Sequence, residues 1–398
     1  MKKQNQKSDE ILNKRRQLGP YPMEKLKRVE QPTTEITESV PRIDRRDEVG
    51  ARTGRGDFGP IVKREMNRDV EKYPVSLAMK DMVLYLGSQA EGKVAPSKAP
   101  IPEDPEILSR HIKSLGYFLR ADIVGICRVP AYAVFSHDYE GNPIELKHKF
   151  AIVVVVDQDY DTFLSSNGSD WISGSQSYRA YSTTSFIASI MADYIRKLGY
   201  PARAHFCHNY QVAMTPLLLW AGIGEMSRVG VALNPFLGMR FKAAAITTDL
   251  PLVPDGPIDF GLQEFCRVCK KCAIECPPRA ISMGDKVMYN GYKSWRTDIP
   301  QCAKFRFANP NGSSCGTCIK VCPWNKRSGW THDAVRWSVK NLPALDRLIV
   351  KMDDIWGYGK QDTAYKWWFD LEEVDGVLQV PKRRAGRLYE ETGVGLRE

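Results

Sequence analysis

The hydrophobic and polar positions between residues 100 and 255 follow two periods. Apolar side chains from Pro105 to Leu119 recur at helical spacing behind Asp104, a good capping residue, and predict a helix. The run from Phe150 to Val156 is continuously apolar and β-branched, which favours a strand covered on both faces. The same patterns predict further helices over 181–198 and 214–221, and strands over 121–127, 202–206 and 241–247. Together they indicate a sheet with helices against it, of the α/β or α+β class.

The two ends of the chain lack this periodicity. Residues 1–60 mix charged residues with Pro and Gly, which predicts an extended arm ordered only by docking. We therefore divide the chain into this arm, a core domain over 61–255, a cysteine-rich module over 256–330 and a C-terminal helical or extended segment over 331–398 that packs on the core. The aromatic stretch 365–369 is expected to contribute to that packing.

Composition narrows the function only a little. The formal net charge of +10 could attract nucleic acid, an acidic electron donor or an anionic substrate. No run of 18 apolar residues occurs, so no membrane-spanning helix is expected. Residues 1–48 are charged, and Arg15-Arg16 is not followed by the apolar stretch of an export signal. We expect a cytoplasmic protein, although removal of a leader would leave the same sequence.

The strongest signal is a cluster of cysteines. Eight of the ten cysteines fall within residues 266–322. The first four form Cys-x2-Cys-x2-Cys-x3-Cys followed by Pro277, a spacing typical of bacterial two-cluster ferredoxins. The last four form Cys-x12-Cys-x2-Cys-x3-Cys followed by Pro323, a variant with a longer first gap. The pattern predicts two 4Fe-4S clusters in a module that transfers electrons.

In such a module three closely spaced thiolates hold one cluster and the fourth reaches the other. We therefore assign a first cysteine group, Cys266, Cys269, Cys272 and Cys322, and a second cysteine group, Cys276, Cys302, Cys315 and Cys318. Zinc is the main alternative for paired Cys-x2-Cys motifs, but it does not explain the triple run with its proline. The remaining Cys127 and Cys207 are expected to be small buried residues in apolar strands.

Four segments carry a resemblance to a known family. They are Phe265-Cys-x2-Cys-x2-Cys-x3-Cys-Pro277, Cys318-x3-Cys-Pro-Trp-Asn325, Ala221-Gly-Ile-Gly-Glu-Met-Ser-Arg-Val-Gly230 and Thr248-Asp-Leu-Pro-Leu252. Over roughly residues 100–330 the chain resembles the corrinoid-dependent reductive dehalogenases. The related epoxyqueuosine reductases share the cluster motifs and a similar Ala-Gly-Leu-Gly stretch.

The resemblance implies an α+β architecture in which a nitroreductase-like α/β domain holds base-off cobalamin beside a ferredoxin-like module. In agreement, the chain lacks the Asp-x-His-x2-Gly motif of enzymes that bind cobalt through His. Candidate cofactor contacts are Gly222, Gly224, Arg228 and Gly230. Residues 331–398 contain no cysteine, so we expect an external electron donor such as a ferredoxin, or a flavodoxin with its reductase.

Reductive removal of a halide needs two electrons and a proton, and therefore a general acid. The resemblance points to Tyr181 as this acid, paired with Lys242, with Tyr178 as its competitor. A cation beside the phenol is expected to lower its pKa. Without the resemblance, Tyr181 would be interpreted as a core aromatic and Lys242 as a strand-end charge reaching solvent.

The resemblance also suggests how substrate binds. Asn209 matches a polar position near the substrate, and Arg306, in the loop between Cys302 and Cys315, matches an arginine that grips a carboxylate. The expected substrate is a halogenated phenol or aromatic acid.

The main alternative function is an epoxyqueuosine reductase acting on tRNA, which the positive charge would suit. Two features favour the dehalogenase instead. They are Glu225 after Ala-Gly-Ile-Gly, where the tRNA enzymes carry Trp, and the arm motif Arg42-x-Asp-Arg-Arg46. A plain electron carrier would not explain the long domain that precedes the clusters.

Overall fold

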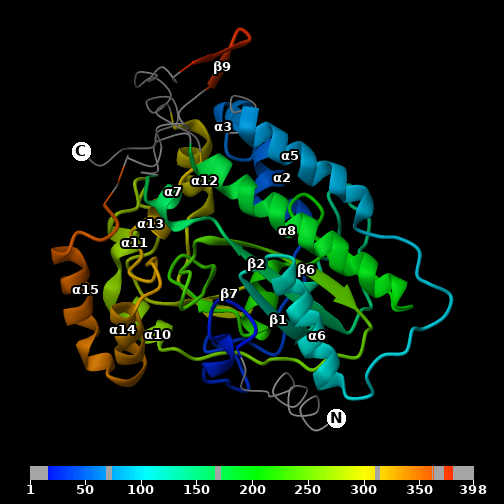
Figure 1. Cartoon of the computed structure of the whole chain (residues 1–398). Coiled ribbons are helices and arrows are strands. Elements are labelled where there is room, and N and C mark those ends of the chain that lie inside the picture. Colours follow the sequence, from blue (N-terminus) through cyan, green and yellow to red (C-terminus); the bar gives the residue numbers. More distant parts are fainter. Residues whose placement is uncertain are drawn as a thin grey trace.

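A four-stranded sheet forms the centre of the protein (Figure 1). The computed structural model describes residues 17–68, 74–165, 172–309, 314–360, 362 and 372–379. The strand order is β1-β2-β6-β3, and every neighbouring pair is antiparallel. The strands are β1 (Ile123–Arg128), β2 (Phe150–Asp157), β6 (Phe241–Thr248) and β3 (Ala202–His205). All four predicted strands are present. Because they pair antiparallel, the fold belongs to the α+β class rather than the α/β class.

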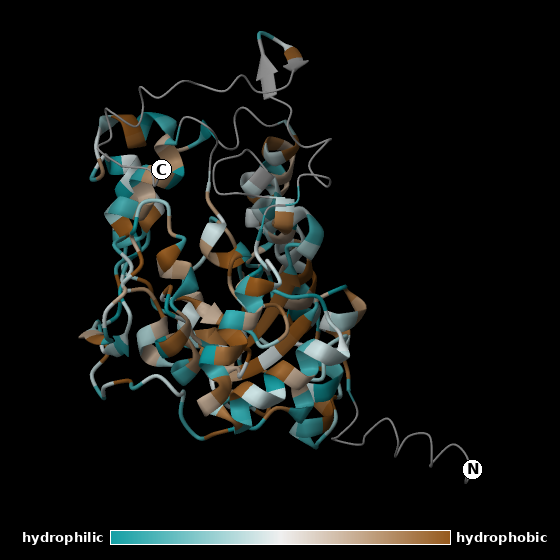
Figure 2. Ribbon diagram, turned by 90° about the vertical axis from the view of Figure 1, so that its left-hand side faces the viewer, coloured by the Kyte–Doolittle hydropathy of each residue, from teal (hydrophilic) through white to brown (hydrophobic). Residues whose placement is uncertain are grey.

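Both faces of the sheet are buried, as the unbroken apolar run of β2 requires. Ile152 and Val154 point to one hydrophobic cluster, whereas Val153 and Val155 point to the other. This is the period of two that a strand imposes on its side chains. Figure 2 shows the strands as the most continuously hydrophobic part of the ribbon. The sheet is thus a rigid layer between two helical or loop layers.

Long helices cover one face of the sheet. They are α5 (Pro74–Leu86), α6 (Pro105–Phe118) and α8 (Ile172–Lys197), while the short α9 (Met214–Trp220) lies on the other face. The helix predicted behind Asp104 is confirmed, because the Asp104 side chain accepts a hydrogen bond from the Glu106 amide at 2.8 Å. Helix α8 begins nine residues before the predicted start. Its first turns contain mostly polar residues such as Ser and Gln, so the sequence there shows no apolar helical period.

The cysteine-rich module consists of short elements. They are α10 (Leu262–Cys269), α11 (Lys271–Ile274), the hairpin β7 (Val287–Tyr289) with β8 (Tyr292–Ser294), α12 (Ile299–Ala308) and α13 (Thr317–Lys320). Helices α14 (Trp330–Asn341) and α15 (Asp346–Ile355) pack against α10. The aromatic stretch 365–369 lies outside the described residues. No helix among the described residues is long and apolar enough to cross a membrane.

The remaining elements are short. The helices are α2 (Val49–Arg55), α3 (Pro60–Glu65) and α7 (Tyr160–Ser165), and the small strand pairs are β4 (Glu225–Met226) with β5 (Ala232–Leu233), and β9 (Glu372–Val374) with β10 (Val377–Gln379). Single 3-10 turns occur at Met23–Lys25, Arg45–Asp47, Gly87–Gln89, Ala131–Ala133 and Pro343–Leu345.

The N-terminal arm contacts both the core domain and the cysteine-rich module. It forms isolated β-bridges from Arg28 to Ile258 and from Ile36 to Tyr292. Farther along, the Arg42 guanidinium donates to three backbone oxygens, those of Val134, Phe135 and Ile144, at 3.0, 2.6 and 2.7 Å. The arm has little regular structure, so its order comes from these contacts.

The arm also explains why a glycine is needed at position 222. Gly222 has a φ of +62°, and a Cβ there would lie 1.8 Å from the Arg28 guanidinium. That guanidinium donates to the carbonyl oxygens of Gly222 and Gly256 at 3.2 and 2.9 Å. A side chain at position 222 would therefore displace the arm.

Replacing Arg42 with Ala should detach this part of the arm. The substitution removes three charge-assisted hydrogen bonds, so we expect a loss of about 1–2 kcal/mol in stability, seen as a lower midpoint of thermal unfolding. The matched control is Arg46→Ala, because Arg46 is exposed and, among the described residues, its side chain pairs with nearby Asp44. We expect the control to change stability by less than about 0.5 kcal/mol. Equal losses in the two variants would contradict a stapling role for Arg42.

Candidate functional site

Two residues predicted from the sequence, Tyr181 and Lys242, lie together at one end of the sheet. Lys242 is the second residue of β6 and shares its face with Ala244 and Ile246, which pack in the cluster under α8. Tyr181 lies on α8 and packs against the same cluster. The Lys242 ammonium is 4.9 Å from the centroid of the Tyr181 ring. The alternation of the strand therefore aims the lysine at the tyrosine rather than at solvent.

The protonation of this pair differs from the expectation. Burial raises the pKa of Tyr181, and the nearby Arg306 only partly offsets it. The expected lowering of the phenol pKa is therefore wrong for this chain. The Lys242 ammonium lies over the face of the ring, and surrounding protein atoms hinder ionisation of the hydroxyl. Burial and the positive charge of Arg306 lower the pKa of Lys242 to about 8.

Arg306 belongs to the same group of charges. It lies on α12, not in a loop as predicted, because Asp298 caps a helix that continues to Ala308. Its Nε atom is buried without a hydrogen-bond partner. Within the described residues, no hydrogen bond or ion pair engages the Tyr181 hydroxyl, the Lys242 ammonium or the Arg306 guanidinium. Three polar groups left unsatisfied near one another are available to a ligand.

Two glutamines that the sequence did not point to also have buried polar atoms without partners. Gln158 follows β2, and its Oε1 is buried without a partner while its Nε2 donates to Ser177 at 3.3 Å. Gln176, on the first turns of α8, has both its amide oxygen and nitrogen buried without a partner. Buried amides are costly when unsatisfied, so they indicate groups that a bound molecule could complete. The sequence gives little indication of their role, because a polar residue beside a strand end or on a helix is common.

Tyr178 and Cys207 flank the pair. The Tyr178 ring meets the Tyr181 ring edge-on at 6.0 Å, and its hydroxyl lies 3.2 Å from Nε2 of His208. Cys207 lies in a turn after β3, not in a strand as predicted, and its pKa is raised to about 12, chiefly by burial. Cys127 is buried in β1, as expected.

Asn209 is held by the protein itself. Its Oδ1 accepts a hydrogen bond from Arg203 at 2.8 Å, and its Nδ2 donates to the Gly87 carbonyl oxygen at 3.3 Å. Both polar ends of the side chain are thus engaged. The contact with substrate stays a prediction, and the structure gives Asn209 a role in fixing the turn after β3.

The four predicted cofactor contacts lie where the core domain meets the cysteine-rich module. Gly222 faces the arm, as described above, and Gly224 faces the backbone of Leu233. Arg228 is fully buried and donates to the carbonyl oxygens of Cys266 and Ser282. Its pKa is lowered by burial, and the thiols of the first cysteine group oppose this shift. Arg228 therefore lies beside that group, and its contact with a cofactor stays a prediction.

The cysteines of the module lie close enough to influence one another's pKa values, and their division into two ligand sets stays a prediction. The pKa of Cys272 is raised by burial and then chiefly by Cys322 and Cys266. The pKa of Cys302 is raised to about 11, by burial and by Cys315 and Cys276. Buried neutral thiols must lose protons to ligate iron, so loading of such a site is coupled to pH. Within the described residues, no three His, Cys, Asp or Glu side chains are arranged to hold a single metal ion.

A buried ion pair joins this module to the end of the sheet. Arg240, two residues before Lys242, contacts both carboxylate oxygens of Asp157, at 2.7 and 2.9 Å. The same guanidinium donates to Oδ1 of Asn325, in the Cys-Pro-Trp-Asn segment that ends the second cysteine motif. The segment carrying Cys322 is thereby fixed to the strand ends that position Lys242.

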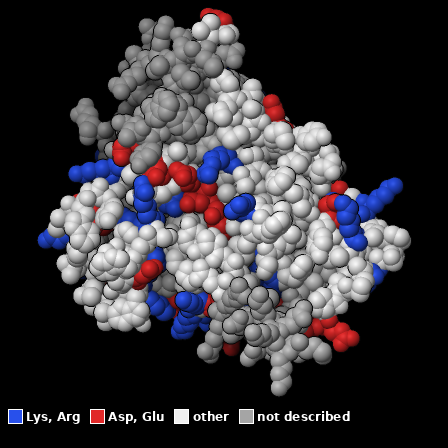
Figure 3. All heavy atoms as spheres, viewed as in Figure 1, with Lys and Arg blue, Asp and Glu red and all other residues white. Residues whose placement is uncertain are grey.

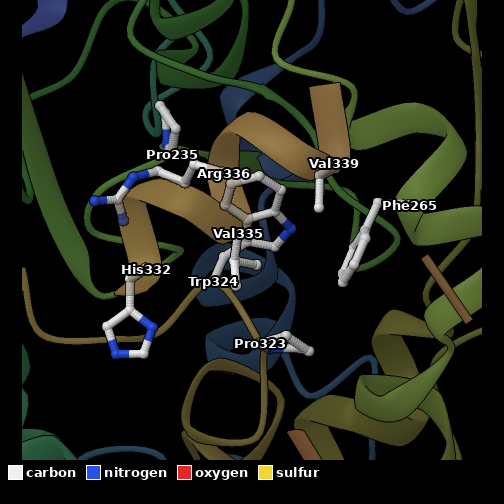
Figure 4. A pocket seen from close by; sticks show the side chains of 8 residues that line it. All are labelled: Pro235, Phe265, Pro323, Trp324, His332, Val335, Arg336 and Val339. Atoms are coloured by element: carbon white, nitrogen blue, oxygen red, sulfur yellow. The ribbon is translucent and has the colours of Figure 1, made fainter. Parts of the chain in front are cut away.

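Figure 4 shows how the rest of this motif is packed. A cavity of about 20 Å³, room for roughly one water molecule, is lined by Pro235, Phe265, Pro323, Trp324, His332, Val335, Arg336 and Val339. The Trp324 ring meets Phe260 and Phe265 edge-on, and its indole nitrogen is buried without a partner. Helix α14 covers this cavity with four of its side chains.

Comparison with known proteins agrees with this architecture. Residues 265–326 match the family model of the 4Fe-4S dicluster domain. The chain is 30% identical over 309 residues to the tetrachloroethene reductive dehalogenase of Sulfurospirillum multivorans, covering 68% of this chain and 61% of that protein. It superposes on the catabolic reductive dehalogenase NpRdhA, in complex with 3-bromo-4-hydroxybenzoic acid, with a TM-score of 0.89 and 41% identity, over 95% of this chain and 56% of that one.

The chain is a homologue of the reductive dehalogenases. A further structure of this family, described for B12-dependent dehalogenation, matches equally well, with a TM-score of 0.89 and 41% identity over 95% of this chain and 55% of that one. The chain spans little more than half the length of these relatives. An epoxyqueuosine reductase of Cyclobacterium marinum is 32% identical over 113 residues, which is 27% of this chain and 35% of that protein. The predicted fold class and its iron–sulfur module are thus confirmed in this dehalogenase homologue.

The ligand assignment can be tested with one cysteine from the second motif. Cys322→Ser should remove the cluster of the first cysteine group and leave the other, lowering iron from about eight to about four atoms per chain. The control is Cys127→Ser, whose sulfur is buried in β1. Iron and sulfide analysis of anaerobically purified protein measures both variants. Unchanged iron in Cys322→Ser would overturn the assignment.

Proposed function

We propose that the protein is a reductive dehalogenase that removes halide from a halogenated phenol or aromatic acid. The observation that carries this proposal is the unsatisfied set of Tyr181, Lys242 and Arg306. The thiol of Cys318 acts on the pKa of Lys242, and Arg306 acts on the pKa of Cys302. A proton donor, two cations and the second cysteine group therefore meet at one end of the sheet. The relative in complex with 3-bromo-4-hydroxybenzoic acid supports the substrate class.

Base-off cobalamin is the proposed partner of this site. The unsatisfied amide groups of Gln158 and Gln176 suit a large polar cofactor, whose own amides could complete their hydrogen bonds. The similarity to a reductive dehalogenase described for B12-dependent dehalogenation supports the same cofactor. When bound, cobalamin would supply the strongly reducing cobalt centre needed for carbon–halogen cleavage.

The reaction consumes two electrons and one proton, and it releases the halide while a hydrogen takes its place on carbon. Tyr181 donates the proton from its hydroxyl. Its raised pKa keeps the hydroxyl protonated near neutral pH, so the proton is present when substrate arrives. The Lys242 charge over the ring stabilises the phenolate that remains. Arg306, with its unpartnered Nε, binds the carboxylate or phenolate of the substrate.

With iron–sulfur clusters bound, the two cysteine groups would pass electrons to this site in turn. The second group is the one whose thiols interact with Lys242 and Arg306, so it lies on the site's side. The first group is then the entry point for electrons from an external donor such as a ferredoxin or flavodoxin. Epoxyqueuosine reduction is the weaker candidate, since that relative matches only 27% of the chain. A cytoplasmic location stays a prediction.

The proton donor can be identified by removing one oxygen atom. Tyr181→Phe should lower turnover by about 10²- to 10⁴-fold while iron and cobalamin content stay unchanged. Tyr178→Phe is the matched control on the same helix, and its turnover should stay within about tenfold of wild type. Turnover of a bromohydroxybenzoate with reduced methyl viologen measures both. The reverse ranking of the two variants would assign the acid to Tyr178.

The pH dependence should report Lys242. Its pKa is lowered to about 8, so the side chain is charged below that pH and neutral above it. Loss of the charge leaves the phenolate unstabilised, and turnover should therefore fall as pH rises through about 8. In Lys242→Arg the charge persists, so the fall should move to higher pH even if the maximum rate is lower. A profile of Lys242→Arg that matches wild type would exclude Lys242 as the titrating group.

A further inference from the structure

We propose that α15 and the end of α10 form the docking surface for an acidic one-electron carrier protein. The carrier would deliver electrons to the cluster of the first cysteine group. This inference rests on the proposed function, which needs two electrons per turnover from outside. It adds where the donor binds and which chemistry it presents.

One face of α15 is apolar and exposed. Leu348, Ile355 and the following Trp356 have exposed fractions of 54%, 70% and 62%. Leu348, Met352 and Ile355 are spaced by four and three residues, so they line a single stripe of the helix. The opposite side packs against α10 and buries Asp353. An exposed apolar stripe on an amphipathic helix marks an interaction surface.

Several positive charges border this stripe, and the exposed Asp354 beside it is paired with Lys271. A hollow of about 420 Å³ between the two helices is lined by Arg267, Val268, Lys270, Arg347 and Val350. Arg267 is paired with Glu264. In the described part of the chain, Lys270, Arg347 and the neighbouring Lys351 form no ion pair. In Figure 3 the edge formed by α15, at the left as in Figure 1, is mostly uncharged and carries projecting Lys and Arg side chains.

The surface is fastened to the segments that carry the first cysteine group. Asp353 of α15 accepts from Lys271, two residues after Cys269, at 2.5 Å. Its other carboxylate oxygen lies 2.6 Å from the ammonium of Lys326, four residues after Cys322. One buried carboxylate thus holds two cysteine-bearing segments against the helix. A partner bound in the hollow rests on Val268 and Lys270, the residues on either side of Cys269.

These features select the kind of partner. Electron-transfer complexes are transient and have small interfaces, in which opposite charges steer the encounter and a few apolar contacts hold it. Unpaired cations around an apolar stripe complement a carrier whose cofactor is ringed by carboxylates. The second cysteine group faces the proposed active site, so electrons from the carrier would enter through the first group. The carrier gives up one electron at each of two encounters per turnover.

The test is reduction of the clusters, followed by stopped-flow absorbance in the complete, iron-loaded protein. A reduced bacterial two-cluster ferredoxin of acidic net charge is the donor. The double variant Arg347→Glu with Lys351→Glu should lower the second-order rate constant by about tenfold or more and weaken its dependence on salt. Lys147→Glu is the control, because Lys147 is exposed and lies outside the cysteine-rich module. Reduction by methyl viologen radical, which needs no docking, should be equally fast in every variant.

Each outcome decides the proposal. An unchanged rate with ferredoxin in the double variant overturns it. Leu348→Asp adds a second check, because a wild-type dimer that this substitution dissociates would show that another copy of the chain covers the stripe, which also overturns it. The readout is separate from dehalogenation. If ferredoxin reduces the clusters through this surface but no halide is released from any halophenol, the docking surface stands and the proposed function fails.

Discussion

The site depends on the buried contact of Arg240 with Asp157 and Asn325. It brings together the end of β2, the start of β6 and the last residues of the second cysteine motif. A buried guanidinium is tolerated only when its partners are complete, and loss of one partner typically costs about 3–5 kcal/mol. Lys242 lies two residues from this contact and Cys322 three residues from its other side. One side chain therefore links the strand end that carries Lys242 to the segment that carries Cys322.

Burial sets the chemistry of the site as strongly as charge does. The same crowding that keeps the proton on Tyr181 makes Lys242 easier to neutralise, and Arg306 pushes both pKa values down. The Nε atom of Arg306 is buried without a hydrogen-bond partner, which costs free energy unless a ligand supplies one. Unsatisfied buried groups of this kind distinguish binding sites from ordinary protein cores.

Most of the framework could be predicted because it follows from periodicity and spacing. The β-branched run of β2, the cap at Asp104 and the two cysteine groups each leave a local pattern. Two of the misses come from contact between distant segments. The arm that contacts Gly222 and the surroundings that raise the pKa of Tyr181 involve residues far along the chain. The hydrogen bond from Arg203 to Asn209 joins residues only six positions apart, but it depends on the turn after β3, which has no periodic pattern. The helix that carries Arg306 has no strong apolar period, so the sequence predicts a loop there.

The route of the N-terminal arm couples the stability of two parts of the protein. Its bridges join Arg28 to Ile258 and Ile36 to Tyr292 in the cysteine-rich module, and Arg42 contacts the core domain. Each bridge closes a loop of roughly two hundred residues or more, and such closure costs conformational entropy. The arm recovers that cost only when the core domain and the module are both folded, so loosening either one releases the arm from both.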